Sequence, residues 1–270
     1  MNQYRAIISK EIYVRRWSLI GFTVASVAFL LLYVLIYPSF QSQAAQFDKL
    51  LQAYPKAILK AFNIDQLQIS NAAGYISAEH FSFVWPLLAI FLAIGTAGNA
   101  IAGEIEKTTM AISLSAPITR ARLYIAKMAS GLIAVGGFAV VSILALIPLT
   151  KLNSVSIDNF NVLKITILGL FFTLAIYSLS LMFSAIYSEK SKVYFWVGGI
   201  LISMYVANIV SGLVDSMKNL QYLSFFHYFA GDKALVHGEL STLSLVVFGS
   251  TALVSLLVGL AVFNKRDIGV

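Results

Sequence analysis

The side chains that could take part in chemistry are few, and their spacing does not favour catalysis. The three histidines, His80, His227 and His237, form no H-E-x-x-H motif and have no acidic residue four positions later. Glu104 and Glu106 lie two positions apart, so they do not share a helix face and do not predict a two-carboxylate acid–base site. The chain has no cysteine and no G-x-x-x-x-G-K-[ST] phosphate loop, which excludes thiol chemistry and ATP hydrolysis by that route. We therefore expect a protein that is not itself an enzyme and holds neither a metal nor a cofactor.

The composition indicates an integral membrane protein. Hydrophobic residues make up 59% of the 270 residues and charged residues only 11%, whereas about 25% is usual for a soluble domain. Six runs are close to the length of about 20 residues that crosses a bilayer, and backbone in hydrocarbon must form helices. We predict one all-α, polytopic membrane domain over residues 1–270 with spans at about 17–37, 81–101, 129–149, 165–187, 193–214 and 242–263.

The distribution of basic residues predicts the orientation of the chain. The termini and the loops on their side (residues 1–16, 103–128, 188–192 and 264–270) carry 12 of the 19 Lys and Arg residues. The positive-inside rule then places both termini in the cytoplasm. Those segments carry 5 of the 12 acids, so the whole formal charge of +7 lies on that side. Topology explains the basic charge without nucleic acid as a partner.

None of the six spans contains Asp, Glu, Lys or Arg. A transporter driven by protons usually has ionisable groups inside its spans, because a side chain must carry the ion. Asn99 and Asn208 are the strongest polar groups there, and we interpret each as an interhelical hydrogen-bonding residue. A chain with neither ion-coupling groups nor a nucleotide site needs energy from outside itself.

Two segments outside the spans have amphipathic patterns. Residues 1–16 predict an N-terminal helix that lies on the membrane, with isoleucines at helical spacing and Arg5, Arg15 and Arg16 towards water or lipid phosphate. A plain basic flank is the alternative. The external segment 38–80 predicts two short helices on the outer leaflet, either as a cap over an exit route or as a linker. The aromatic cluster at 222–229 predicts a re-entrant or interfacial turn.

The most densely charged stretch is the cytoplasmic loop 103–127, "GEIEKTTMAISLSAPITRARLYIAK". Thr108 and Thr109 can cap a short helix that Pro117 ends. Thr119 can cap the next helix, which leads into the third span. A short helix beneath the membrane with both apolar and charged groups suits contact with a protein partner; a solvated loop that only follows the topology rule is the alternative.

This loop resembles that of type-2 ABC exporter permeases. In that family an acidic pair, a Gly-Thr, a hydrophobic segment, a proline, a Ser/Thr-Arg and a lysine recur in this order. The matching residues are Glu104, Glu106, Thr109, Leu114, Ser115, Pro117, Thr119, Arg120 and Lys127. Thr108 departs from the pattern, since the family often has Gly there. "YLSFFHYF" at 222–229 and "FNKRDI" at 263–268 resemble two further family segments, so the resemblance covers essentially the whole chain.

The resemblance implies a permease subunit without its own ATPase. Two permease subunits, identical or homologous, would form the pathway through the bilayer, and separate ABC ATPase subunits would bind ATP and Mg. The N-terminal helix and a coupling helix within the loop would form the docking surface. The residues that we expect to dock the ATPase or to position the coupling helix are Glu104, Glu106, Thr109, Pro117, Arg120 and Arg122.

Two alternatives remain at this stage. One is a scaffold, regulatory or immunity-type subunit that partners an ATPase but moves no substrate. The other is an intramembrane enzyme, which the scarcity of polar residues in the spans disfavours. Aromatic residues in the spans suit an amphipathic, lipid-like or peptide cargo, although packing is their more common role. The lack of cysteine and the compact single-domain chain favour a bacterial cytoplasmic membrane.

Overall fold

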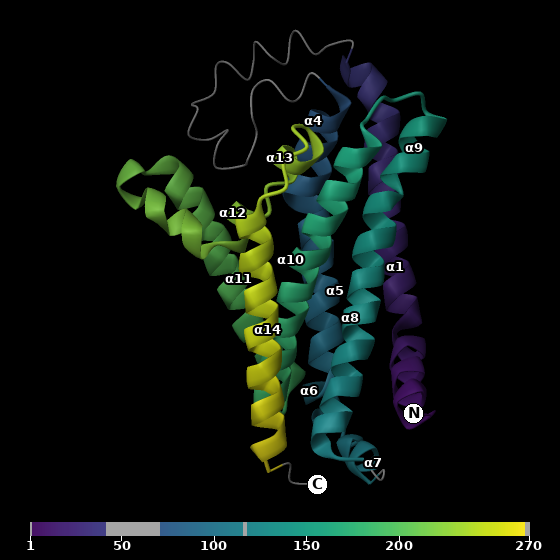
Figure 1. Cartoon of the computed structure of the whole chain (residues 1–270), viewed down its shortest axis with the longest axis vertical. Helices are drawn as coiled ribbons and strands as arrows, with labels where there is room; N and C mark the ends of the chain where they lie inside the picture. Colours follow the sequence, from purple (N-terminus) through teal and green to yellow (C-terminus); the bar gives the residue numbers. More distant parts are fainter. Residues whose placement is uncertain (1, 42–70, 116–117, 268–270) are drawn as a thin grey trace.

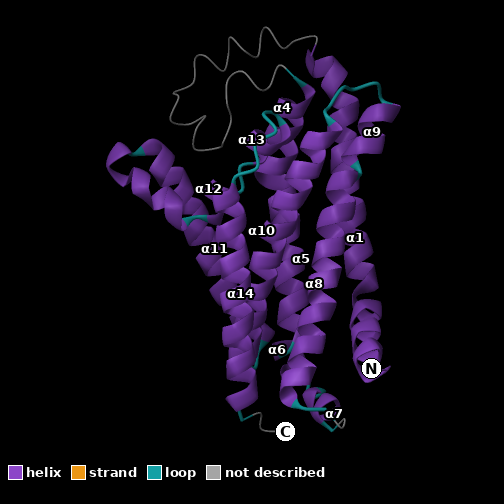
Figure 2. Cartoon of the chain, viewed as in Figure 1, coloured by secondary structure: helices purple, strands orange, loops and turns teal. Residues whose placement is uncertain are grey.

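A computed structural model describes residues 2–41, 71–115 and 118–267 of the chain, and these residues form helices and loops without strands (Figure 2). Within them, six segments are long and apolar enough to cross a membrane. They are Ile7–Gln41, Ala72–Ala100, Arg120–Leu152, Asn159–Ile186, Lys190–Leu213 and Thr242–Lys265. The predicted all-α architecture with six candidate spans is confirmed.

The long helices run side by side along the long axis of the molecule (Figure 1). They are α1 (Asn2–Gln41), α5 (Trp85–Ala100), α8 (Arg120–Leu144), α10 (Asn159–Ile186), α11 (Lys190–Leu213) and α14 (Thr242–Lys265). Helix α10 is central, because it packs against α5, α8, α11 and α14, while α1 packs mainly against α8. The start of α1 and the end of α14 lie at the same end of the bundle, here called the terminal end.

Helix α1 differs from the expected arrangement at the N-terminus. We expected a separate surface helix over residues 1–16, but α1 continues from Asn2 to Gln41 without a break. Gly21 lies five positions after residue 16, but the helix passes through it without a break. The N-terminal turns are therefore continuous with the first candidate span, and their location at the membrane surface stays a prediction.

The second span also begins earlier than predicted. Helix α4 (Ala72–Ile76) and a π-helix (Ser77–Val84) lead directly into α5. The predicted external segment 38–80 therefore overlaps the helix that starts at Ala72, and its two predicted short helices fall on residues 42–70, outside the described residues. His80, which we placed at the end of the external segment, is buried in the bundle.

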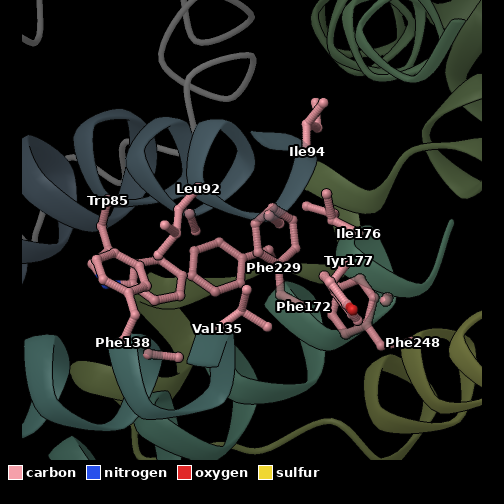
Figure 3. Packing of buried hydrophobic residues seen from close by; sticks show 14 of the residues in the cluster. Trp85, Leu92, Ile94, Val135, Phe138, Phe172, Ile176, Tyr177, Phe229 and Phe248 are labelled. Carbon is pink, nitrogen blue, oxygen red and sulfur yellow. The ribbon is translucent and has the colours of Figure 1, made fainter. Parts of the chain in front are cut away.

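The core of the bundle is aromatic and lies where α5, α8 and α10 meet (Figure 3). The Trp85 ring stacks between Phe138 and Phe229, with centroid distances of 6.0 and 5.5 Å. Phe172 follows in the same row, 4.7 Å from Phe229. Trp85 Nε1 donates a hydrogen bond to Ser142 Oγ at 2.9 Å, so the one polar atom of this side chain has its partner inside the core.

The end opposite the terminal end carries further short elements besides α4. They are α9 (Leu146–Leu152), a 3₁₀-helix (Asp215–Leu223), α12 (Phe225–Tyr228) and α13 (Gly231–Leu235). The 3₁₀-helix projects from the bundle beside the end of α11 (Figure 1) and has no buried residue. Helix α13 packs on α10 and the π-helix. The interfacial location predicted for 222–229 stays a prediction.

Candidate functional site

The loop between the second and third spans lies at the terminal end of the bundle (Figure 1). It forms the short helices α6 (Ala102–Glu106) and α7 (Met110–Leu114) before α8 begins. The prediction that Thr119 caps the next helix is confirmed, because its side-chain oxygen accepts a hydrogen bond from the Arg122 backbone N–H at 3.4 Å. Pro117 lies outside the described residues, so its role in ending α7 stays a prediction.

The turn between α6 and α7 depends on Thr108. This residue has a φ of 57°, in the left-handed region that glycine adopts most easily. The family often has glycine here, and the structure gives the physical reason. We predicted that the neighbouring Thr109 caps α7, but its side chain does not do so. Its hydroxyl instead donates a hydrogen bond to the Glu104 carbonyl at 3.3 Å.

Lys127 is the centre of a buried chain of ion pairs. Its ammonium group donates to Glu104 Oε1 at 2.6 Å and to Glu11 Oε1 at 2.8 Å, and its side chain is only 1% exposed. Glu11 also pairs with Arg15 at 2.5 Å, and Glu104 accepts a hydrogen bond from Ser113 Oγ at 3.1 Å. We call Arg15, Glu11, Lys127 and Glu104 the ion-pair chain. It joins α1, α8 and α6, and Ser113 adds α7.

Helix α10 also contacts this lysine, through the backbone carbonyl of Lys127. Tyr177 of α10 is fully buried, and its hydroxyl donates to the Lys127 carbonyl at 3.1 Å. Gly131, one turn further along α8, makes room for this ring: a methyl group added there would lie 1.9 Å from the Tyr177 hydroxyl oxygen. The glycine therefore allows α8 and α10 to approach closely.

Glu106 and Arg120 also make contacts within the chain. The Glu106 carboxylate accepts a hydrogen bond from the Lys190 backbone N–H at 3.1 Å, at the start of α11, where unpaired N–H groups favour a negative charge. The Arg120 guanidinium donates to the Arg266 carbonyl. Both residues thus hold elements of the terminal end in position.

Arg266 closes the end of α10. Its guanidinium donates to the carbonyls of Ala185 and Tyr187 at 2.9 and 3.0 Å and also to Ser188 Oγ. The last carbonyls of a helix have no partner within it, and a cation there also complements the helix dipole.

The outer side of the loop is exposed. Ile112 of α7 is 70% exposed. Thr109 before this helix and Arg122 in the first turn of α8 are also exposed. Of the three arginines that we expected on the N-terminal helix, Arg5 is exposed and Arg15 belongs to the ion-pair chain. The third, Arg16, lies over the Tyr13 ring at 3.5 Å. Docking by any of the predicted residues stays a prediction.

Glu11 is the residue that our sequence reasoning missed. It follows Ile7 and Ile8 by four and three positions, so it lies on the apolar stripe of its helix. A lone acid on such a stripe signals a buried charge that needs a partner. Lys127 was matched to the family pattern, but its burial was not foreseen, because we placed it just before the third span.

The other polar groups of the described residues make separate, local contacts. Within the part of the chain that the structure describes, no three His, Cys, Asp or Glu side chains are placed to hold a metal ion. His80 Nε2 lies 3.4 Å from Ser26 Oγ, and Asn99 donates to the Gly95 carbonyl of its own helix at 2.8 Å. Burial, and to a lesser extent the charge of Lys233, lowers the pKa of His227 and so favours its neutral imidazole.

A groove of about 470 Å³ lies between α5 and α11. Apolar side chains such as Phe91 and Ile202 dominate its lining, with Ser82, Tyr194 and Tyr205 as its polar members. Phe91 and Ile202 are also largely exposed. The groove can accept a hydrocarbon chain or an apolar side chain, and it offers no charged group to a ligand.

Comparison with known proteins supports the resemblance seen in the sequence. The family model described as ABC-2 family transporter protein matches residues 5–268, which is nearly the whole chain. A comparison with curated proteins gives no significant match.

Proposed function

Because the chain belongs to the ABC-2 transporter family, we propose that it is the permease subunit of an ATP-driven exporter. In this proposal two permease subunits, identical or homologous, form the pathway across a bacterial cytoplasmic membrane. Separate ATPase subunits bind ATP and Mg²⁺ and dock from the cytoplasm. The outward direction and the ATPase partner follow from the family resemblance.

The observation that carries the docking proposal is the position of α7. This helix lies at the terminal end of the bundle, and the distribution of basic residues predicts that this end faces the cytoplasm. Its Ile112 side chain points out of the protein with 70% of its surface exposed, yet α7 is connected to the long helices through Ser113 and Glu104. A firmly connected helix at this end of the bundle suits a partner that must move the bundle, and Ile112 offers that partner an apolar contact.

The groove between α5 and α11 supports a pathway for an amphipathic or lipid-like cargo. Its lining is almost entirely apolar, which matches the polarity of the apolar part of such a ligand. The cargo's charged or polar group would lie outside the groove, because the lining has no charge to pair with it.

The docking proposal is tested by purifying the tagged chain from its host in mild detergent and in lipid nanodiscs. We expect a phosphate-loop ATPase to copurify with the parent chain and to be lost from Ile112→Asp. Leu152→Asp is the matched control, because Leu152 is 81% exposed at the opposite end of the bundle. Retention of the ATPase by Ile112→Asp would refute docking through α7. A parent chain that never carries an ATPase would refute the permease–ATPase proposal itself.

A further inference from the structure

The ion-pair chain offers a physical connection between the predicted docking surface and the membrane helices. We propose that Lys127 is a positioning residue: by pairing with Glu104 and Glu11 together, it makes α6–α7 and the N-terminal turns of α1 move as one body. This inference rests on the proposed function, in which the ATPase displaces α7. It assigns a role to Glu11 and Lys127 that the docking surface itself does not require.

Burial is the first observation behind this inference. Lys127 is 1% exposed and Glu11 is 9% exposed at their side chains, although charged residues are rarely buried so fully. Buried ion pairs contribute little net stability, and apolar residues of similar size are often as good or better. Such groups are best attested as devices that fix one register between packed elements. Stability alone therefore does not explain why a lysine occupies this position.

Connectivity is the second observation. Starting from α7, Ser113 donates to Glu104 at 3.1 Å, Glu104 pairs with Lys127 at 2.6 Å, and Lys127 pairs with Glu11 at 2.8 Å. Each contact is short and directional, and each joins a different pair of elements. Displacing α7 while α1 stays in place would separate opposite charges in a buried site, which is strongly unfavourable.

The Lys127 backbone extends the same connection to α10 through the Tyr177 hydroxyl, at 3.1 Å. The charged contacts of α6–α7 thus lead into α1 and α8, and one further hydrogen bond leads into α10. Helix α11, which lines the groove, is reached separately through Glu106 and the Lys190 N–H at 3.1 Å. A displacement at the terminal end accordingly has defined contacts through which it reaches four spans.

The test measures whether α7 and α1 hold one fixed distance. The natural chain has no cysteine, so Lys10→Cys and Ser115→Cys place two spin labels at exposed positions on α1 and at the end of α7. We expect a narrow distance distribution in nanodiscs. In the ATPase complex the mean distance between the two labels should change by no more than about 2 Å between the nucleotide-free and ATP-trapped states. A change of that size is typical of a small helix shift.

The variant that separates positioning from stability is Lys127→Met combined with Glu11→Gln and Glu104→Gln. Because Arg15, whose side chain is 11% exposed, pairs with Glu11, the variant also carries Arg15→Gln. It thereby removes all four charges of the ion-pair chain together, so no unpaired ion remains buried and the chain should still fold and insert. We expect its label distribution to be at least twice as wide as in the parent. A parent-like width would overturn the proposal, as would a parent distance that shifts by a full helix turn of about 5 Å on ATP trapping.

A second variant tests the inference without touching a buried charge. Ser113→Ala removes only the hydrogen bond from α7 to Glu104 and should also broaden the distribution, while leaving thermal stability close to that of the parent. The comparison of distribution widths between parent and variant is made on the chain alone in nanodiscs, with the same labels at Lys10→Cys and Ser115→Cys and without an ATPase. An unchanged width in both variants defeats the positioning role, whereas an absent ATPase defeats only the proposed function.

Discussion

Replacing Gly131 by alanine is expected to separate α8 from α10 at the terminal end of the bundle. An added methyl group would lie 1.9 Å from the Tyr177 hydroxyl oxygen, 2.1 Å from its Cζ and 2.5 Å from its Cε2. All three distances are far below van der Waals contact, and they involve the ring as well as the hydroxyl. The ring is fully buried, so it cannot move aside into solvent and the helices must adjust.

Three terms set the size of the effect on the free energy of unfolding. Overpacking a well-filled core costs about 1–3 kcal/mol, and losing the hydrogen bond from Tyr177 to the Lys127 carbonyl costs roughly 0.5–1.5 kcal/mol more. Alanine recovers about 0.8–1 kcal/mol through its higher helix propensity. The net loss is about 2 kcal/mol, which lowers the midpoint of thermal unfolding by roughly 4–8 °C for a chain of this size.

The assay is thermal unfolding of the purified chain in one detergent, followed by light scattering and tryptophan fluorescence. Gly137→Ala is the matched control, since Gly137 is in the same helix and a methyl group there meets nothing within 4 Å. Its midpoint should stay the same or rise. Equal midpoints for the two alanine variants would refute the packing argument.

The double variant Gly131→Ala/Tyr177→Phe should lose about 1 kcal/mol less stability than the sum of its single changes, because both changes remove the same hydrogen bond.

Two further changes test the local geometry. Thr108→Gly should raise stability by about 1 kcal/mol, because glycine adopts the left-handed conformation of this turn without the strain of a β-branched residue; a lower unfolding midpoint would contradict that assignment. Ser142→Ala leaves the buried Trp85 N–H without its 2.9 Å acceptor and should cost about 1–3 kcal/mol. Blue-shifted Trp85 fluorescence should accompany it, and an unchanged midpoint would show that the indole finds another partner.

The six candidate spans could be predicted because the membrane imposes length and hydrophobicity on each segment separately. Thr119 was predictable for a similar reason, since a cap depends on residues three positions apart. Both features are encoded in short stretches of sequence. The start of the second span was missed because Ser77 and His80 are polar, and only tertiary packing against α1 and α13 covers them.

The ion-pair chain was beyond the reach of local sequence reasoning. Glu11 and Lys127 are 116 positions apart, and their pairing depends on how α1 packs against α8. The sequence did draw attention to Glu104, Glu106 and Arg120, either as contacts for a partner or as residues that position the coupling helix. In the structure each of them contacts a neighbouring element of the same chain. Among the predicted docking residues, Glu106, Thr109 and Arg122 are exposed.

The position of Arg266 has a consequence for the biosynthesis of this protein. Domains form from the N-terminus onwards as the chain leaves the ribosome, yet the carbonyls that end α10 receive their hydrogen bonds from a residue near the C-terminus. Arg120 likewise finds its carbonyl partner on Arg266. The terminal end of the bundle therefore stays open until Arg266 itself has been synthesised and has folded back. A chain that stops just before Arg266 would carry all six candidate spans but lack these hydrogen bonds, and quality-control proteases could recognise it by that open end.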